Sequence, residues 1–137
     1  MSAYVDVKTC YKKHNMALLA EALREMGYEV ETHEKPVGLY GYHGDLRPQK
    51  ANVVVRRRHV GPSANDIGWE FNEDGTCTEH ISEYDRGHTF KKVKQDKLAQ
   101  TYAEKVVTQA AKKSGFKMGK TIEADGSIKM KLTRTKW

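Results

Sequence analysis

The longest periodic segment of this chain covers about residues 90–114, and it limits the fold more than any other feature. Leu98, Tyr102 and Val106 are spaced by four residues, which places them on one face of an α-helix. Gly115 follows as a helix stop. The pattern predicts one long helix whose apolar stripe packs on a core, and it leaves only short segments for the other elements.

Shorter segments on both sides of this helix predict one more helix and several strands. Asn15 is a suitable helix N-cap, the apolar residues after it fall on one helical face, and Gly27 supplies the stop. Prolines and glycines predict an irregular connection over residues 35–50, with room for a short strand at 39–42. Strands are expected where β-branched residues cluster or polar and apolar residues alternate, at residues 4–9, 28–34, 51–56, 67–71, 76–81, 116–122 and 127–133.

This order of elements predicts the fold class. Helices separated by strand hairpins favour an α+β fold, with a mostly antiparallel sheet and the two helices packed on one face. At 137 residues and without a long linker, the chain is expected to form a single domain over residues 1–137. Apolar residues make up 38% and charged residues 31%, which indicates a thin core or a surface that a partner completes.

The net charge of +6 is unevenly distributed along the sequence. Residues 1–88 contain 11 Lys and Arg against 14 Asp and Glu, a net charge of −3. Residues 89–137 contain 13 against 4, a net charge of +9. Such asymmetry indicates an anionic partner for the C-terminal part, with solubility alone as the alternative.

The sequence carries no sign of secretion or of a membrane segment. Its first residues lack the basic and apolar regions of a signal peptide, and no apolar run approaches the roughly 20 residues that span a bilayer. Cys10 and Cys77 lie far apart and form no CxxC, which is typical of free thiols in a reducing compartment. We therefore expect a cytoplasmic protein without a membrane partner, or a stromal one if it is encoded in a plastid.

Short motifs spread in order along nearly the whole chain resemble one protein family. They include Val5-Asp6-Val7-Lys8-Thr9, Met26-Gly27-Tyr28, Gly41-Tyr42, Ala51-Asn52-Val53-Val54-Val55, Asp66-Ile67-Gly68-Trp69, Gly115-Phe116 and Asp125-Gly126-Ser127-Ile128. Their order and spacing are similar to the hypothetical chloroplast reading frame thirty-five family, a domain of unknown function in plastids, cyanobacteria, other bacteria and phages. The resemblance implies a small cytosolic or stromal protein and supplies no reaction, cofactor or catalytic residue. The chain departs from that pattern in the basic cluster at residues 56–59 and in the length of the segment 56–65.

The first candidate site is basic and serves polyanion binding. Lysines spaced by three or four residues along the long helix form a row, and arginines and lysines from two other segments are expected to join it. The members are Lys94, Lys97, Lys105, Lys112, Arg56, Arg57, Arg58, Lys129 and Lys131. The alternative is a solvated helix face that binds nothing specific.

The second candidate site is a small ligand pocket that combines glycines with aromatic side chains. Glycines let a backbone approach a ligand, and aromatic rings supply a stacking wall. The residues are Tyr40, Tyr42, His43, Asp66 and Trp69. The alternative is that Gly68 marks a bulge, that both tyrosines pack at a sheet edge, and that Trp69 alternates with Ile67 and Phe71 as a core residue.

Enzyme chemistry has the weakest support in the sequence. The six histidines form no HxH, HxxxH or HExxH pattern, and the Gly-rich phosphate loops and the GxSxG nucleophile motif are missing. The densest polar group, His80 to His88, is expected to be a solvated loop. We therefore expect no catalytic residue, no metal and no cofactor.

The leading expectation is a non-enzymatic binding module that docks onto a protein partner or a polyanion through its basic C-terminal part. The alternatives are a small-ligand or nucleotide-binding pocket and a nucleic-acid-binding protein. A free edge of an antiparallel sheet also allows a homo-oligomer.

Overall fold

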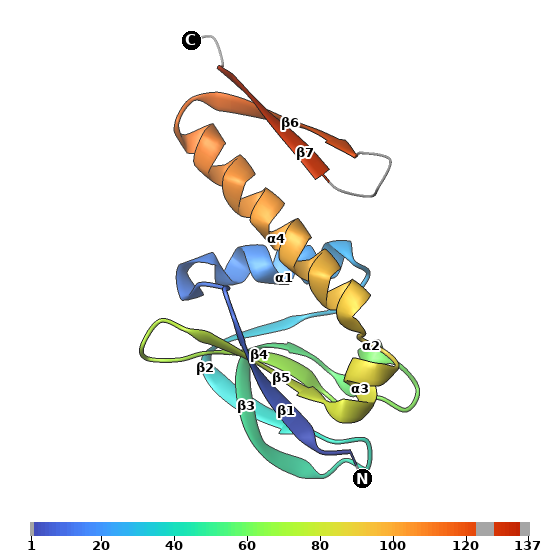
Figure 1. Ribbon diagram of the computed structural model, residues 1–137. Coiled ribbons are helices and arrows are strands. Elements are labelled where there is room, and N and C mark those ends of the chain that lie inside the picture. Colours follow the sequence, from blue (N-terminus) through green and yellow to red (C-terminus); the bar gives the residue numbers. More distant parts are fainter. Residues whose placement is uncertain (1, 123–127, 135–137) are drawn as a thin grey trace.

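A five-stranded antiparallel sheet forms the body of the computed structural model, which describes residues 2–122 and 128–134 (Figure 1). The strands of this sheet are β1 (Tyr4–Thr9), β2 (Glu31–Tyr40), β3 (Leu46–Val55), β4 (Ile67–Phe71) and β5 (Cys77–Ser82). Their order across the sheet is β1-β5-β4-β3-β2, so β2 to β5 form a meander and β1 is added beside β5. β1 and β2 are therefore the two edges of the sheet.

Two long helices cover one face of this sheet. The helices of the described chain are a 3-10 turn (Lys13–Asn15), α1 (Met16–Glu25), α2 (Arg57–Val60), α3 (Glu83–Gly87) and α4 (Lys92–Lys113). α1 lies over the sheet, and α4 crosses α1 on the side away from the strands (Figure 1). Gly27 and Gly115, which follow α1 and α4, have φ values of +98° and +79°, in the left-handed region that glycine adopts without strain.

One hydrophobic core lies between the sheet and the helices. Ile67, Trp69 and Phe71 alternate along β4 and all point into it. The N-terminal half of α4 contributes Leu98 and Tyr102, and the Tyr102 ring meets the ring of Tyr11 edge-on at a centroid distance of 4.8 Å. The core thus joins β4, α4 and the segment before α1, as the apolar stripe of the long helix predicts.

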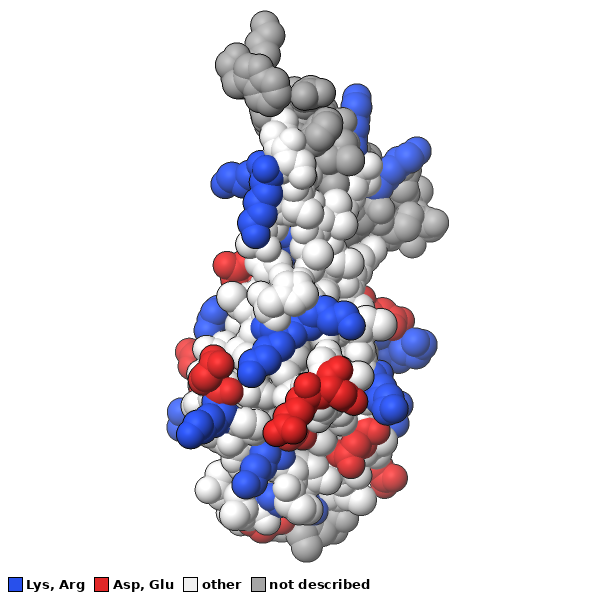
Figure 2. All heavy atoms as spheres, turned by 90° about the vertical axis from the view of Figure 1, so that its left-hand side faces the viewer, with Lys and Arg blue, Asp and Glu red and all other residues white. Residues whose placement is uncertain are grey.

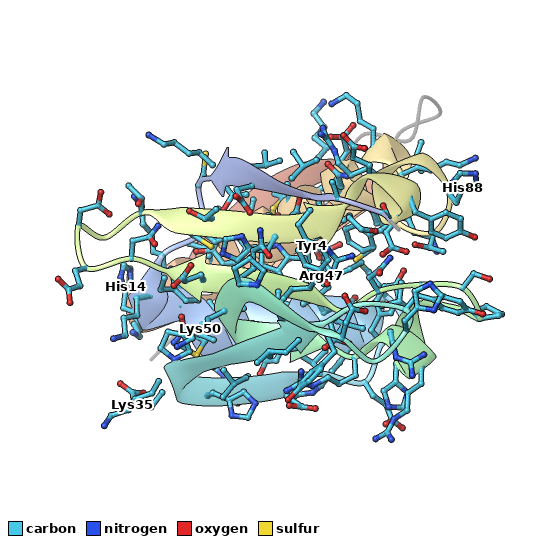
Figure 3. The ribbon with its side chains drawn as sticks, turned by 90° about the horizontal axis from the view of Figure 1, so that it is seen from below. Tyr4, His14, Lys35, Arg47, Lys50 and His88 are labelled. Atoms are coloured by element: carbon cyan, nitrogen blue, oxygen red, sulfur yellow. The ribbon has the colours of Figure 1, made fainter. Side chains whose placement is uncertain are left out.

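The sheet curls so that the beginning of β3 returns toward β1, although the two strands are not neighbours in it. The Arg47 guanidinium of β3 lies 5.4 Å from the ring centroid of Tyr4 in β1, and the two side chains are seen together in Figure 3. The Tyr4 hydroxyl donates a hydrogen bond to the carbonyl of Asp66 (2.5 Å). On the face opposite the helices, Leu39, Ala51 and Val54 form a smaller apolar cluster. A Cβ at Gly68 would collide with Ala51, so this close approach requires a glycine there.

The last two strands form a separate sheet. β6 (Phe116–Ile122) and β7 (Ile128–Arg134) pair only with each other among the described residues, and this hairpin projects from the far end of α4 (Figure 1). We call residues 107–134, the end of α4 with this hairpin, the C-terminal arm. No described residue after Val106 belongs to the two apolar clusters.

The α+β class, the single domain and the antiparallel sheet with helices are confirmed. The prediction of an irregular segment over residues 35–50 was wrong, because β2 and β3 continue through most of it. Pro36 lies at a register shift of the edge strand β2, and Pro48 lies in a part of β3 that β4 does not pair with. Neither proline therefore removes a ladder hydrogen bond of a central strand. None of the described helices combines the length and the apolar character that a membrane crossing needs.

Candidate functional site

The lysine row of α4 does not face solvent along its whole length. Thr101, in the middle of the row, is buried against the core. Lys105 forms an ion pair with Glu25 of α1 (2.8 Å), and the Lys94 ammonium lies 5.7 Å from the ring centroid of Tyr28. The row therefore passes over α1 at its centre, where its side chains hold the two helices together.

The remaining predicted lysines are exposed and extend beyond the core. Lys97 is exposed near the start of α4, and Lys112, Lys129 and Lys131 are exposed on the C-terminal arm. In Figure 2, Lys and Arg alternate with Asp and Glu over the sheet, whereas the upper end shows Lys or Arg and no Asp or Glu among the coloured residues. α4 has 22 residues, so at 1.5 Å per residue it carries the β6–β7 hairpin about 33 Å from its own first residue.

Arg56 is held inside the protein by two carboxylates. Its Nε and Nη2 donate to the two carboxylate oxygens of Glu31 at 2.9 and 3.1 Å, and its Nη1 donates to Asp66 Oδ2 (2.9 Å) and to the carbonyl of Gly38 (3.0 Å). The hydrogen bond from Arg56 holds the pKa of Glu31 below its ordinary value, and the same bond raises the pKa of Arg56. These four bonds engage all three nitrogens of the guanidinium, so Arg56 has a structural role.

Asp66 fixes the backbone around this ion pair. It is 1% exposed, and its carboxylate accepts hydrogen bonds from the N–H groups of Tyr40 (2.8 Å) and Arg57 (2.7 Å) in addition to the bond from Arg56. The end of β2, the start of α2 and the approach to β4 therefore converge on one buried side chain. Hydrogen bonds from three donors offset the cost of burying a carboxylate.

Arg57 and Arg58 point into an open hollow beside this network. The hollow has a volume of about 420 Å³ and is lined by Glu31, Tyr40, Gly44, Arg56, Arg57, Arg58 and Asp66. Among the described residues, no carboxylate pairs with the guanidinium of Arg57 or of Arg58, and Arg58 Nε donates to His59 Nε2 (3.1 Å). Tyr40 is 43% exposed. The hollow therefore combines two arginines free to bind an anion with an accessible aromatic ring.

The structure divides the predicted pocket residues among three places. Tyr40 and Asp66 line the arginine hollow, whereas Tyr42 and His43 line a neighbouring hollow of about 240 Å³. Trp69 is fully buried in the core, where its Nε1 donates to Glu79 Oε1 (3.1 Å). Trp69 is thus the core residue that its alternation along β4 indicates.

The basic residues also form two groups rather than one surface. Arg57 and Arg58 lie on α2, beside the N-terminal end of α4, and Lys129 and Lys131 lie on the hairpin at the other end of α4 (Figure 1). A Cβ on Gly61, just after α2, would lie 3.3 Å from Thr89, just before α4. The arginines and the β6–β7 hairpin are therefore separated by the length of the long helix.

Two polar groups were missed because their members are distant in the sequence. His80 of β5 lies between two carboxylates, with Nδ1 2.6 Å from Asp6 and Nε2 2.8 Å from Glu70. Asp85, which is fully buried, accepts hydrogen bonds from Ser82 Oγ (2.7 Å) and from the N–H of Asn65 (3.0 Å). The region from His80 to His88, predicted to be a solvated loop, is therefore largely structured.

The titratable residues of the described chain form no cluster of three or more His, Cys, Asp and Glu side chains that could hold a metal ion. Cys10 is exposed and Cys77 is buried, and both are free thiols. Burial raises the pKa of Cys77 to about 11, so its thiol stays protonated at neutral pH and is a poor nucleophile.

Fold and surface together define a small α+β protein with exposed basic side chains beside α2 and on the C-terminal arm. Residues 22–131 match a protein family described as "Protein of unknown function (DUF1257)". Because the match covers more than half of the chain, the protein belongs to this family. No curated protein matches the chain, and no solved structure does.

Proposed function

We propose that the protein is a non-enzymatic binding module that docks onto a polyanion through its C-terminal arm. The observation that carries this proposal is the position of the arm. α4 anchors its first half in the core through Leu98 and Tyr102, and its second half continues away from the sheet with the β6–β7 hairpin at its end. A projecting element whose described residues join neither apolar cluster is typical of a part retained for contact with a partner.

The charge of the arm supports a polyanion. Residues 107–134 contain seven Lys and Arg against two Asp and Glu, a net charge of +5. Of the lysines whose side chains are described, Lys112, Lys113, Lys129 and Lys131 are all exposed. Closely placed lysines bind phosphate chains by releasing the counterions that surround them, so the affinity comes from charge and requires no preformed pocket.

A nucleic acid fits this charge better than a smaller anion does. The seven-residue strands β6 and β7 of the arm each span about 23 Å, and duplex DNA carries one phosphate charge for about every 1.7 Å of its axis. Extended charge on the arm therefore meets extended charge on the partner. An acidic protein surface is the second candidate, since docking through charge requires no base-specific contact.

The proposal also includes the cellular compartment and the resemblance to a particular family. The ordered motifs resemble the hypothetical chloroplast reading frame thirty-five family, and the two cysteines are free thiols. Both features support a protein of the cytosol or of the plastid stroma. Enzyme activity is not part of the proposal.

The test compares two variants that remove the same number of charges from different regions. The arm variant replaces Lys112, Lys113, Lys129 and Lys131 with Gln. The control variant replaces four exposed lysines of the sheet and the segments around it, Lys8, Lys12, Lys35 and Lys50, with Gln. Binding of each protein to a labelled RNA duplex, a labelled single strand and heparin is measured over a range of salt concentrations.

We expect the arm variant to lose about tenfold or more in affinity for the RNA at low salt. The slope of log affinity against log salt should also flatten by about 3, because each lost phosphate contact removes about 0.7 to 0.9 from it. The control variant should bind as the wild type does. Equal losses in the two variants would show that net charge alone is responsible. If neither RNA nor heparin binds, while one acidic protein partner does, the polyanion proposal is wrong.

A further inference from the structure

We propose that the hollow bounded by Tyr40, Arg57 and Arg58 is a second binding site, which takes a mononucleotide-sized ligand with a phosphate group and an aromatic ring. This site is independent of the C-terminal arm, because α2 lies at the opposite end of α4 from the hairpin. The volume of about 420 Å³ falls in the range of about 300–1,000 Å³ that is usual for small-molecule sites.

The floor of the hollow is fixed before any ligand arrives. Asp66 holds the backbone N–H groups of Tyr40 and Arg57 at 2.8 and 2.7 Å, and it is itself bonded to Arg56. Asn65 continues the network, since its Oδ1 accepts from the N–H of Tyr42 and its own N–H donates to the buried Asp85. The backbone that carries the lining side chains therefore needs little ordering on binding, which favours affinity for a small ligand.

Arg57 and Arg58 supply the phosphate-binding groups. The guanidinium of Arg56 is already bonded to Glu31, Asp66 and Gly38, whereas no described carboxylate pairs with the other two arginines. A planar guanidinium binds phosphate oxygens in a bidentate manner, with charge-assisted hydrogen bonds. Arg57 and Arg58 both line the hollow, so their guanidinium groups can approach the same phosphate, with Arg58 Nε already donating to His59.

Tyr40 supplies the surface for an aromatic ring. Its side chain is 43% exposed although its backbone is held by Asp66, and the Arg56 guanidinium lies 6.0 Å from its ring centroid. A tyrosine that is fixed at its backbone and open at its ring offers a stacking platform at little entropic cost.

The charge of the lining selects a small anion over a long one. Three arginines and two carboxylates, Glu31 and Asp66, line the hollow, which leaves a net charge of +1. A longer chain of phosphates would come close to the carboxylate of Glu31, whose side chain is 41% exposed, while a single phosphate needs only Arg57 and Arg58. The hollow therefore differs in kind from the C-terminal arm, whose charge is almost all of one sign.

The experiment titrates the full-length protein with three probes by calorimetry: adenosine monophosphate, inorganic phosphate and adenosine. The test variant is Arg57→Ala combined with Arg58→Ala, which keeps the Arg57 N–H that holds Asp66. The matched control is Lys112→Gln combined with Lys113→Gln, which removes two charges from the arm. Thermal melts of all variants confirm that each is folded.

We expect adenosine monophosphate to bind more tightly than either of its two halves. The double arginine variant should weaken it at least tenfold, since a hydrogen bond to a charged group contributes about 1.5–3 kcal/mol. Tyr40→Leu should weaken adenosine monophosphate about fivefold or more and leave inorganic phosphate unchanged, because stacking on an aromatic side chain contributes about 1–3 kcal/mol per base. The lysine control should bind all three probes as the wild type does.

Three results would overturn the proposal. The first is no binding of adenosine monophosphate at millimolar concentration by a folded wild type. The second is binding that the double arginine variant leaves unchanged. The third is an equal loss in the lysine control, which would assign the binding to the arm. Loss of RNA binding in the arm variant with nucleotide binding intact would support two independent sites.

Discussion

The molecule has two regions that are built on different principles. One is the sheet with its two helices, and the other is the C-terminal arm; α4 belongs to both. In the sheet region, several charged side chains are buried or half-buried with partners around them, as Asp66, Asp85 and Arg56 are, beside exposed lysines such as Lys8 and Lys50. In the arm, the described lysines point into water, and the two apolar clusters contain no described residue after Val106, although Ala111 is buried. The first region is held together by burial, and the second is attached to it by one helix.

This difference separates stability from function. Changes in the sheet region should alter the free energy of unfolding, because its side chains are packed at the density of a protein interior. Changes in the arm should alter contacts with a partner and leave unfolding nearly unchanged. The hollow bounded by Tyr40, Arg57 and Arg58 lies between these two cases. Its floor belongs to the buried network, whereas the guanidinium groups of Arg57 and Arg58 do not.

The largest expected effect comes from the core tryptophan. Trp69→Ala should lower the free energy of unfolding by about 3–5 kcal/mol, because it leaves a cavity next to Phe90 and removes the donor that bonds to Glu79. Val107→Ala, at a residue that is 41% exposed in the arm, should change it by less than about 0.5 kcal/mol. Urea denaturation, monitored by circular dichroism at a wavelength where tryptophan does not contribute, measures the change in the free energy of unfolding for both variants.

The comparison between the two regions fails if these two substitutions have similar effects. A large loss from Val107→Ala would mean that the arm packs on the sheet region in solution. A small loss from Trp69→Ala would mean that β4 is not at the centre of the core. Phe71→Leu serves as a control for β4, since a change between two apolar side chains in a core costs less than truncation to alanine.

A smaller effect is expected from the pH dependence of stability, and it belongs to Glu79. Burial raises the pKa of Glu79 above its ordinary value of 4.5, although the hydrogen bond from Trp69 acts in the opposite direction. Between the ordinary and the raised pKa, the folded state holds a proton that the unfolded state has released. Stability therefore falls as pH rises through that window, with a slope for one group of at most about 1.4 kcal/mol per pH unit.

Glu79→Gln should flatten this part of the profile, because the amide cannot ionise and its oxygen still accepts the hydrogen bond from Trp69. The measurement is a series of thermal melts from acidic to neutral pH, with the exposed Glu73→Gln as the matched control. If Glu79→Gln leaves the profile unchanged while Glu73→Gln flattens it, then the carboxylate of Glu79 is not buried in the folded protein.

The sequence predicts the parts of the fold that depend on local patterns. Alternation places Trp69 in the core, spacing by four places Leu98 and Tyr102 there, and Gly27 and Gly115 end the two long helices. These predictions hold because each depends on the backbone geometry of a single element. The continuation of β2 and β3 could not be predicted, since it depends on where the neighbouring strands stop pairing.

The candidate sites, too, could be predicted only where they depend on local sequence patterns. Three consecutive arginines look equivalent in the sequence. In the structure, however, Arg56 donates hydrogen bonds to Glu31, 25 residues before it, and to Asp66, 10 residues after it. The lysine row is regular along α4, yet the crossing of α4 over α1 buries Thr101 and pairs Lys105 with Glu25. Tertiary contacts decide which charged side chains remain without a partner. The helical or strand periodicity of a sequence contains no information about those contacts.

A small effect on stability is also expected from removing most of the arm, and this change tests the comparison most directly. A chain that ends at Ser114 should lose less than about 1 kcal/mol in the free energy of unfolding, because the two apolar clusters contain no described residue beyond Val106. The exposed last turns of α4 should fray, so helical circular dichroism falls slightly more than the number of deleted residues explains. Binding of the same chain to duplex RNA should drop as far as that of the arm variant. A loss of several kcal/mol would instead show that the hairpin packs against the sheet region, and the arm would then be part of the fold.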